Sequence, residues 1–112
     1  MHLNELKNAL GISGILTEAS IWYNGNAQID LLVKRADRMI NVCEMKFSTG
    51  KYTITKDYEA KLRSKLEEFR TATKCKEGLL LTFVTTYGVN QGKNSSIVQA
   101  EVTLDKLFRS TV

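Results

Sequence analysis

Histidine and cysteine, the residues that most often hold zinc, are scarce: the chain has one histidine and two cysteines in 112 residues. His2 stands at the N-terminus, and Cys43 and Cys75 belong to neither a Cys-x-x-Cys motif nor a Cys/His cluster. Structural zinc requires four such ligands, so no zinc site is expected. No signal peptide precedes the two cysteines, so we expect free thiols and a reducing, cytoplasmic setting rather than a disulfide framework.

Long apolar runs are also missing. The longest are only a few residues, whereas a transmembrane helix needs about 20, so no membrane partner is expected. The length fits a single domain spanning 1–112, with one core. Sixteen Lys and Arg against twelve Asp and Glu give a net charge of +4. That excess is compatible with a polyanionic partner such as nucleic acid, and equally with solvated lysines.

The first segment has helical spacing. Leu3, Leu6 and Leu10 lie on one helical face, and Gly11 is a natural C-terminal stop. No capping residue precedes this helix, which suggests that the chain is a piece of a larger protein.

Three strands are predicted next, over 15–23, 28–34 and 39–47, because these runs are rich in β-favouring or alternating residues. Asn24-Gly25 favours a hairpin turn between the first two strands, and the charged residues 35–38 favour another. In the second strand, strict alternation would place Ile29, Leu31 and Val33 on one face and Asp30 on the other. Three consecutive strands of this kind form an antiparallel meander.

The second half predicts a helix over 56–73, capped by Thr55, because its apolar residues recur at helical spacing. The apolar run 79–84 is typical of a strand buried on both faces and parallel to a neighbour. An edge strand over 97–102 follows, and then a short helix that Thr103 caps and whose Leu104, Leu107 and Phe108 pack inward. The expected fold is therefore α/β, a mixed sheet flanked by helices.

Two acidic residues and one lysine stand out on the second and third strands. If these strands pair about a turn centred on Asp37, positions whose numbers add up to 74 face each other, and Asp30 stands opposite Glu44. Two opposed carboxylates repel each other, and a cation between them removes the penalty. Lys46 lies two residues beyond Glu44 on the same face. Ordinary sheet packing does not require this group.

The group suits divalent-metal chemistry. Magnesium is typically held by one or two carboxylates together with substrate phosphate oxygens and waters, so Asp30 and Glu44 are candidate ligands for Mg²⁺ or Mn²⁺. Such an ion polarises a phosphoryl oxygen and lowers the pKa of a bound water. The ammonium of Lys46 would orient or deprotonate that water and offset developing negative charge.

The spacing of these residues resembles a known family. Gln-Ile-Asp at 28–30 and Cys-Glu-Met-Lys at 43–46, followed by a helix and an apolar strand, look like the PD-(D/E)XK nuclease superfamily with its restriction-endonuclease-like fold. More narrowly, the chain is similar, from His2 to Phe108, to the C-terminal domain of a group of prokaryotic AAA+ type ATPases. Residues 7–12, 54–58 and 83–88 contribute to this similarity.

The resemblance implies metal-dependent hydrolysis of DNA phosphodiester bonds, with Asp30 and Glu44 as metal ligands, Lys46 as the catalytic lysine and an ATPase domain as partner in the same parent chain. The superfamily commonly adds an acidic residue from its first helix. Glu5 is the only helical candidate here, and we expect the usual residue to lie upstream of Met1.

Other interpretations stay open. Asp30, Glu44 and Lys46 could form a surface salt-bridge cluster. The whole domain could be a catalytically silent nuclease-fold module that regulates an ATPase, or a nucleic-acid-binding domain without cleavage. Lys61, Arg63 and Lys65 could meet phosphates or form intrahelical ion pairs. Gln28 could contact a metal-bound water or substrate, or be a solvated glutamine. Trp22 and Tyr23 could stack on bases, although a single tryptophan on a strand is usually a core residue. Tyr58 is expected to be a core residue first and a neighbour of the site second.

Overall fold

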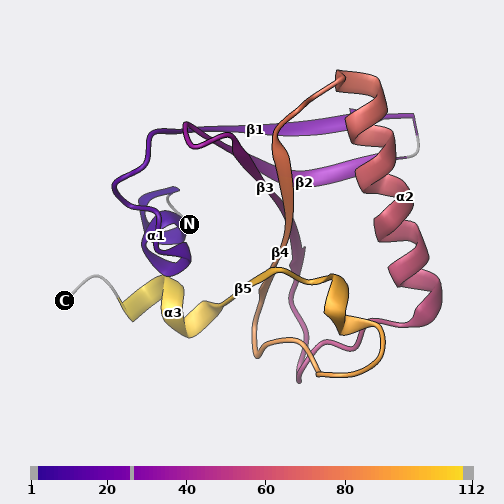
Figure 1. The fold of residues 1–112 in the computed structure, drawn as a ribbon. Coiled ribbons are helices and arrows are strands. Elements are labelled where there is room, and N and C mark those ends of the chain that lie inside the picture. The colour runs from indigo at the N-terminus through magenta and orange to yellow at the C-terminus, as the bar shows by residue number, and fades with distance from the viewer. Residues whose placement is uncertain (1–2, 26, 110–112) are drawn as a thin grey trace.

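The computed structural model describes residues 3–25 and 27–109, and the side chains of these residues up to 107. The fold is α/β, with a five-stranded mixed sheet (Figure 1). His2 and the Phe108 side chain, which carried expectations above, lie outside the described part. In order across the sheet, the strands are β1 (Thr17–Asn24), β2 (Ala27–Arg35), β3 (Met39–Lys46), β4 (Gly78–Thr85) and β5 (Ala100–Thr103).

The strand directions agree with the sequence-based expectation. β1, β2 and β3 form an antiparallel meander, and β4 runs parallel to both β3 and β5. All residues of β4 from 81 to 85 are buried, as expected for a strand covered on both faces. The strand predicted over 97–102 is shorter than expected, because residues 95–97 form a 3₁₀ helix and β5 begins only at Ala100.

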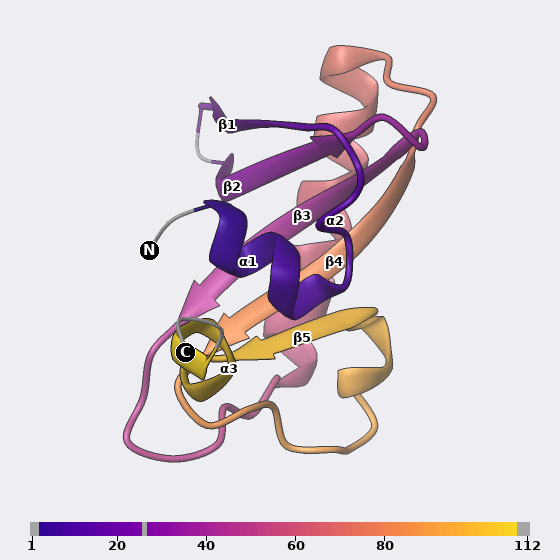
Figure 2. The same cartoon turned by 90° about the vertical axis from the view of Figure 1, so that its left-hand side faces the viewer.

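Helices cover the two faces of the sheet unequally. The helices are α1 (Leu3–Leu10), α2 (Lys56–Thr73) and α3 (Leu104–Arg109). In Figures 1 and 2, α1 and α3 lie together on one face, and α2 alone crosses the other. Each face therefore has its own core cluster, one under α2 and one under α1 and α3.

The bounds of α2 coincide with the predicted helix 56–73. The Thr55 hydroxyl accepts a hydrogen bond from the Tyr58 amide at 3.1 Å, which satisfies one of the free N–H groups of the first turn. Lys74 ends the helix in a left-handed conformation. Leu62 and Phe69, seven residues apart, are buried against the sheet and fix which side of the helix faces β2 and β3.

A β-bulge interrupts β2 and corrects its expected alternation. The register with β1 pairs Ser20 with Leu32 but Trp22 with Ile29, so two residues of β2 oppose one of β1. Ile29 consequently packs into the core under α2, whereas Val33 packs under α1 and α3. The expectation that Ile29, Leu31 and Val33 share one face was wrong, because a strict period of two cannot pass through a bulge.

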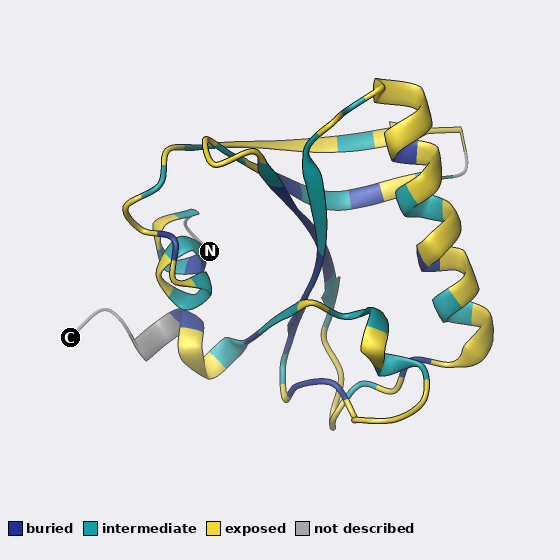
Figure 3. Cartoon of the chain, viewed as in Figure 1, coloured by how far each residue is buried: buried dark blue, intermediate teal, exposed yellow. Residues whose placement is uncertain are grey.

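β1 is an edge strand, and most of its residues are exposed (Figure 3). Trp22 turns toward α2, where its ring meets Phe69 edge-on with centroids 5.3 Å apart, so it is a packing residue as anticipated. Tyr23, the alternative stacking residue, is 73% exposed. Within the described residues, no helix is both long and apolar enough to cross a membrane.

The two thiols should differ sharply in reactivity. Cys43 is fully buried under α1 and α3, and burial, aided by the nearby charge of Glu44, raises the pKa of its thiol to about 12. Cys75 is partly exposed. At mildly alkaline pH the native protein should react with a thiol reagent at Cys75 only, and in denaturant at both cysteines, since the thiolate is the reactive species. Rapid labelling of Cys43 in the native protein, located by peptide mass spectrometry, would contradict this packing.

Candidate active site around Glu44

The register of β2 and β3 has the predicted centre, but the paired residues stop one position short of Asp30 and Glu44. Leu31 pairs with Cys43 and Leu32 with Val42, so each pair of numbers adds up to 74. Continued by one residue, this register would set Asp30 opposite Glu44. The paired ladder ends at Leu31, where the bulge begins, and the Asp30 side chain takes over: its Oδ2 accepts the Met45 amide N–H at 3.0 Å. Asp30 therefore joins the two strands through its side chain.

Glu44 is almost completely buried, with 2% of the residue exposed. Its Oε1 accepts hydrogen bonds from the Lys65 ammonium at 2.9 Å and from the Tyr58 hydroxyl at 3.2 Å. Its Oε2 is buried and has no hydrogen-bond partner among the described residues. A buried carboxylate is stable only when it is paired and hydrogen-bonded, and here the compensation reaches one oxygen and leaves the other unsatisfied.

Both partners of Glu44 come from α2. Tyr58 and Lys65 are seven residues apart and so lie two turns apart on one side of the helix, the side that also buries Leu62 and Phe69. Lys65 lies on the side of α2 that faces the sheet. A lysine in such a position indicates a partner inside the domain, and this was a signal in the sequence. The intrahelical ion-pair interpretation fails for Lys65 but holds for Arg63, which lies 3.6 Å from Glu59 one turn earlier.

Tyr58 connects the carboxylates to the aromatic core. Its ring packs edge-on against Tyr52 and Phe83, with centroids 6.1 Å and 6.4 Å away. Burial first, and then the negative charge of Glu44, strongly raise the pKa of the Tyr58 hydroxyl, with a smaller contribution from Asp30. The phenol is therefore a hydrogen-bond donor to Glu44 throughout the neutral range. Tyr58 is both a core residue and a member of the site.

Lys46 lies beside this group without bonding to Glu44. Its ammonium is 5.0 Å from the centroid of the Tyr58 ring, an arrangement in which a cation is attracted to the ring face. Lys46 and Lys65 are both partly exposed, but only Lys65 is bonded to Glu44. The structure thus brings Glu44, Tyr58, Lys46 and Lys65 together, and the hydrogen bond from the Met45 amide holds Asp30 on the neighbouring strand.

The surface salt-bridge interpretation does not fit a carboxylate with 2% exposure. Glu5 lies on α1, which packs against the face of the sheet opposite to α2, so it does not join Glu44. Gln28 is exposed, but it lines a groove of about 360 Å³ between the start of β2 and α2, together with Tyr58 and Lys65. The Glu44 site therefore adjoins an open groove.

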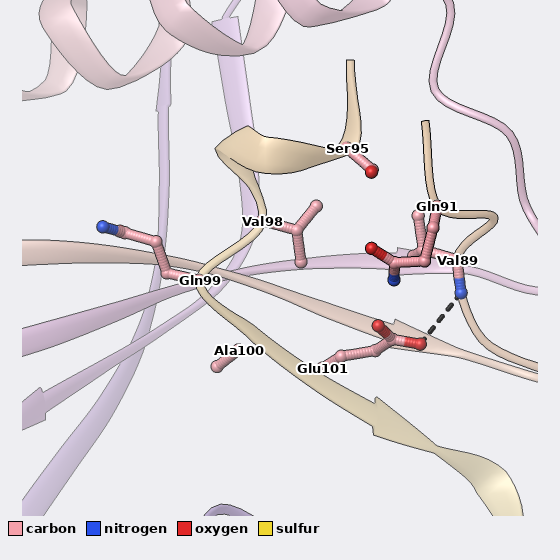
Figure 4. A pocket seen from close by; sticks show the side chains of 7 residues that line it. All are labelled: Val89, Gln91, Ser95, Val98, Gln99, Ala100 and Glu101. Atoms are coloured by element: carbon pink, nitrogen blue, oxygen red, sulfur yellow. Dashed lines mark hydrogen bonds between the residues drawn. The ribbon is translucent and has the colours of Figure 1, made fainter. Parts of the chain in front are cut away.

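A second hollow, of about 200 Å³, lies beside β5 and is lined by Val89, Gln91, Glu101 and neighbouring residues (Figure 4). The carboxylate of Glu101 accepts the Val89 amide N–H at 2.9 Å, drawn as a dashed line in Figure 4. Gly88 has φ of +100° and leaves no room for a Cβ beside this carboxylate. Glu101 thus anchors the loop that follows β4, and its role is structural.

The donor set fits a divalent cation in part. Asp30 and Glu44 provide two carboxylates, and the unpartnered Oε2 of Glu44 is a ready ligand atom. Across residues 3–25 and 27–109 there is no cluster of three or more His, Cys, Asp or Glu side chains that could hold a metal ion. The protein alone would supply two ligand residues, and substrate and water would complete the shell.

Comparison with known proteins does not assign this arrangement: no protein-family model and no curated protein matches the sequence.

Removing the Lys65 ammonium should destabilise the fold. In Lys65→Met, Glu44 remains as a buried charge without its counter-ion, and a broken buried pair typically costs ~3–5 kcal/mol. Lys65 is one-fifth exposed, so we expect a value toward the lower end of that range. The double variant Glu44→Gln/Lys65→Met should recover most of the loss in urea-unfolding measurements. Additive effects of Glu44→Gln and Lys65→Met would show that the two side chains are not coupled.

Asp30 should contribute to stability through an acceptor atom rather than through its charge. Asp30→Asn keeps an oxygen for the Met45 amide and should lose little, whereas Asp30→Ala leaves this N–H without its partner and should lose about 1–3 kcal/mol. Urea unfolding of both variants measures the difference. Equal losses would mean that the hydrogen bond does not hold β2 to β3.

Proposed function

We propose that the chain is a divalent-metal-dependent nuclease-type domain of the PD-(D/E)XK class, with a restriction-endonuclease-like fold, that hydrolyses DNA phosphodiester bonds. The observation that carries the proposal is the Glu44 carboxylate, buried to 2% exposure yet with one oxygen unpartnered and next to an open groove. Asp30 lies one residue beyond the paired part of β2 and is hydrogen-bonded to the amide that follows Glu44. A purely structural buried carboxylate would be expected to have both oxygens satisfied.

Asp30 and Glu44 would hold Mg²⁺ or Mn²⁺, whose contribution when bound is to polarise a phosphoryl oxygen and acidify a water. Lys46 orients or deprotonates the attacking water and offsets charge on the phosphate. Its contact with the Tyr58 ring limits where the ammonium can reach. Tyr58 orients Glu44 by donating its hydroxyl hydrogen to Oε1.

The element order supports the same proposal. An antiparallel meander, then a helix, then a strand parallel to the third is the arrangement that the resemblance implies, and the acidic pair falls on β2 and β3. By the same resemblance, the domain would be joined to an ATPase in its parent protein and act in the cytoplasm. Fold resemblance alone does not establish an activity, so the residues of the site must carry it.

A second function is favoured by one contact. Lys65 already neutralises Glu44, as a permanent structural ion pair would. In that case the domain is a catalytically silent module that binds a partner or nucleic acid and regulates its ATPase. Calorimetric titration with Mn²⁺ separates the two functions, because a silent module need not bind the ion.

The nuclease proposal predicts metal-dependent cleavage of plasmid or single-stranded DNA by the wild-type protein. Asp30→Asn, which keeps the hydrogen bond to Met45, and Lys46→Met should each reduce the cleavage rate at least about a hundredfold. Lys106→Met serves as the matched control, since Lys106 is an exposed lysine on α3 across the sheet. Equal cleavage by all four proteins would point to a contaminating enzyme and refute the catalytic assignment.

A further inference from the structure

Lys65 stands at the boundary between the buried carboxylate and the groove. Its ammonium binds Glu44 Oε1 at 2.9 Å, while its side chain is 20% exposed and lines the groove with Gln28 and Lys61. A lysine carries its charge on a flexible four-carbon stem. The same ammonium can therefore reach Glu44 or turn toward the groove by a change of rotamer.

Glu44 cannot satisfy Lys65 and a divalent cation equally well. The carboxylate has one negative charge, and a doubly charged ion on Oε2 would lie close to the ammonium on Oε1. In a buried setting like charges at this range repel strongly. Lys65 therefore opposes metal binding at Glu44, and the metal affinity rises when Lys65 withdraws or when negative charge beyond that of Asp30 arrives.

The side chains that line the groove could bind a negatively charged group. Lys61, Ser64 and Gln28 provide an ammonium, a hydroxyl and an amide on its walls, and Lys65 would add a second ammonium. Glu68 is the one carboxylate among the lining residues. Lys61 is exposed and forms no salt bridge within the described part of the chain. Two ammonium groups with neutral donors between them suit a phosphate group.

We propose, as an extension of the proposed function, that this groove binds a backbone phosphate of the nucleic-acid substrate. Lys65 is then a positioning residue whose ammonium moves from Glu44 to this phosphate. Without substrate, Lys65 competes with the metal ion for Glu44 and keeps metal affinity low. Once a phosphate occupies the groove, it draws the ammonium away and supplies the missing negative charge. Metal and substrate then bind cooperatively, each raising the affinity for the other by the same factor.

Two substitutions of Lys65 should change Mn²⁺ affinity in opposite directions when no nucleic acid is present. Lys65→Met removes the competing charge and should raise the affinity at least about tenfold. Lys65→Arg keeps the charge and can bind both carboxylate oxygens of Glu44 at once, so it should lower the affinity by a similar factor. Calorimetric titration with MnCl₂ measures both, and because Arg preserves the ion pair, this arm stands even if Lys65→Met fails to fold.

Lys61 provides the matched comparison on the same helix. It lines the groove but has no contact with Glu44, so Lys61→Met should leave Mn²⁺ affinity unchanged. Both Lys61→Met and Lys65→Met should weaken binding of a fluorescent DNA duplex in EDTA by about threefold to tenfold and reduce its salt dependence by about one phosphate contact. Lys106→Met should alter neither property.

The outcomes separate this inference from the nuclease proposal. Cleavage by the wild-type protein with the same Mn²⁺ affinity in the wild type, Lys65→Met and Lys65→Arg would refute the exchange of Lys65 and leave the nuclease standing. DNA affinity unaffected by Lys61→Met and Lys65→Met would refute phosphate binding in the groove. Failure of every variant to bind Mn²⁺, together with no cleavage, would refute both proposals.

Discussion

The ion pair between Glu44 and Lys65 is the interaction on which the α2 side of the molecule depends. It places a carboxylate inside the sheet and its counter-ion on the helix that covers it, so strand and helix must come together in one register. An isolated carboxylate at this depth would be too costly to remain ionised. The Tyr58 hydroxyl adds a second bond from the same helix. The geometry of the site and the packing of α2 on the sheet therefore depend on the same contacts.

Much of the architecture could be predicted from the sequence, because its strongest signals are local. The hydrophobic period and the Thr55 cap defined α2, and the turn around Asp37 fixed the β2–β3 register from Leu31 to Lys34. The β-bulge in β2 was not predicted. The adjacent Leu31 and Leu32 allow the buried residues of this strand to be assigned to either face, so the sequence does not show where the alternation shifts. The late start of β5 had a similar cause, because a 3₁₀ turn interrupts a run of β-favouring residues.

The composition of the site was only partly visible in the sequence. Asp30, Glu44 and Lys46 belong to two strands that follow each other in the sequence, β2 and β3. Their relative positions can be predicted by counting residues from the turn between these strands. Lys65 is 21 residues beyond Glu44 and lies on α2. Its pairing with Glu44 depends on how α2 is rotated about its axis over the sheet. Lys46 lies over the Tyr58 ring, a contact that the strand spacing does not reveal. Helix rotation is a tertiary property that spacing suggests but does not determine.

Tyr58 and Lys65 belong to one rigid helix, and Leu62 and Phe69 on the same stripe are the side chains that seat this helix on the sheet. Small tilts of α2 would therefore displace a phenol and an ammonium together by comparable amounts. Removing apolar volume beneath α2 would therefore disturb the hydrogen bonds to Glu44 as well as the packing of the helix. The apolar side chains of Leu62 and Phe69 thus help to set the positions of the polar groups around Glu44.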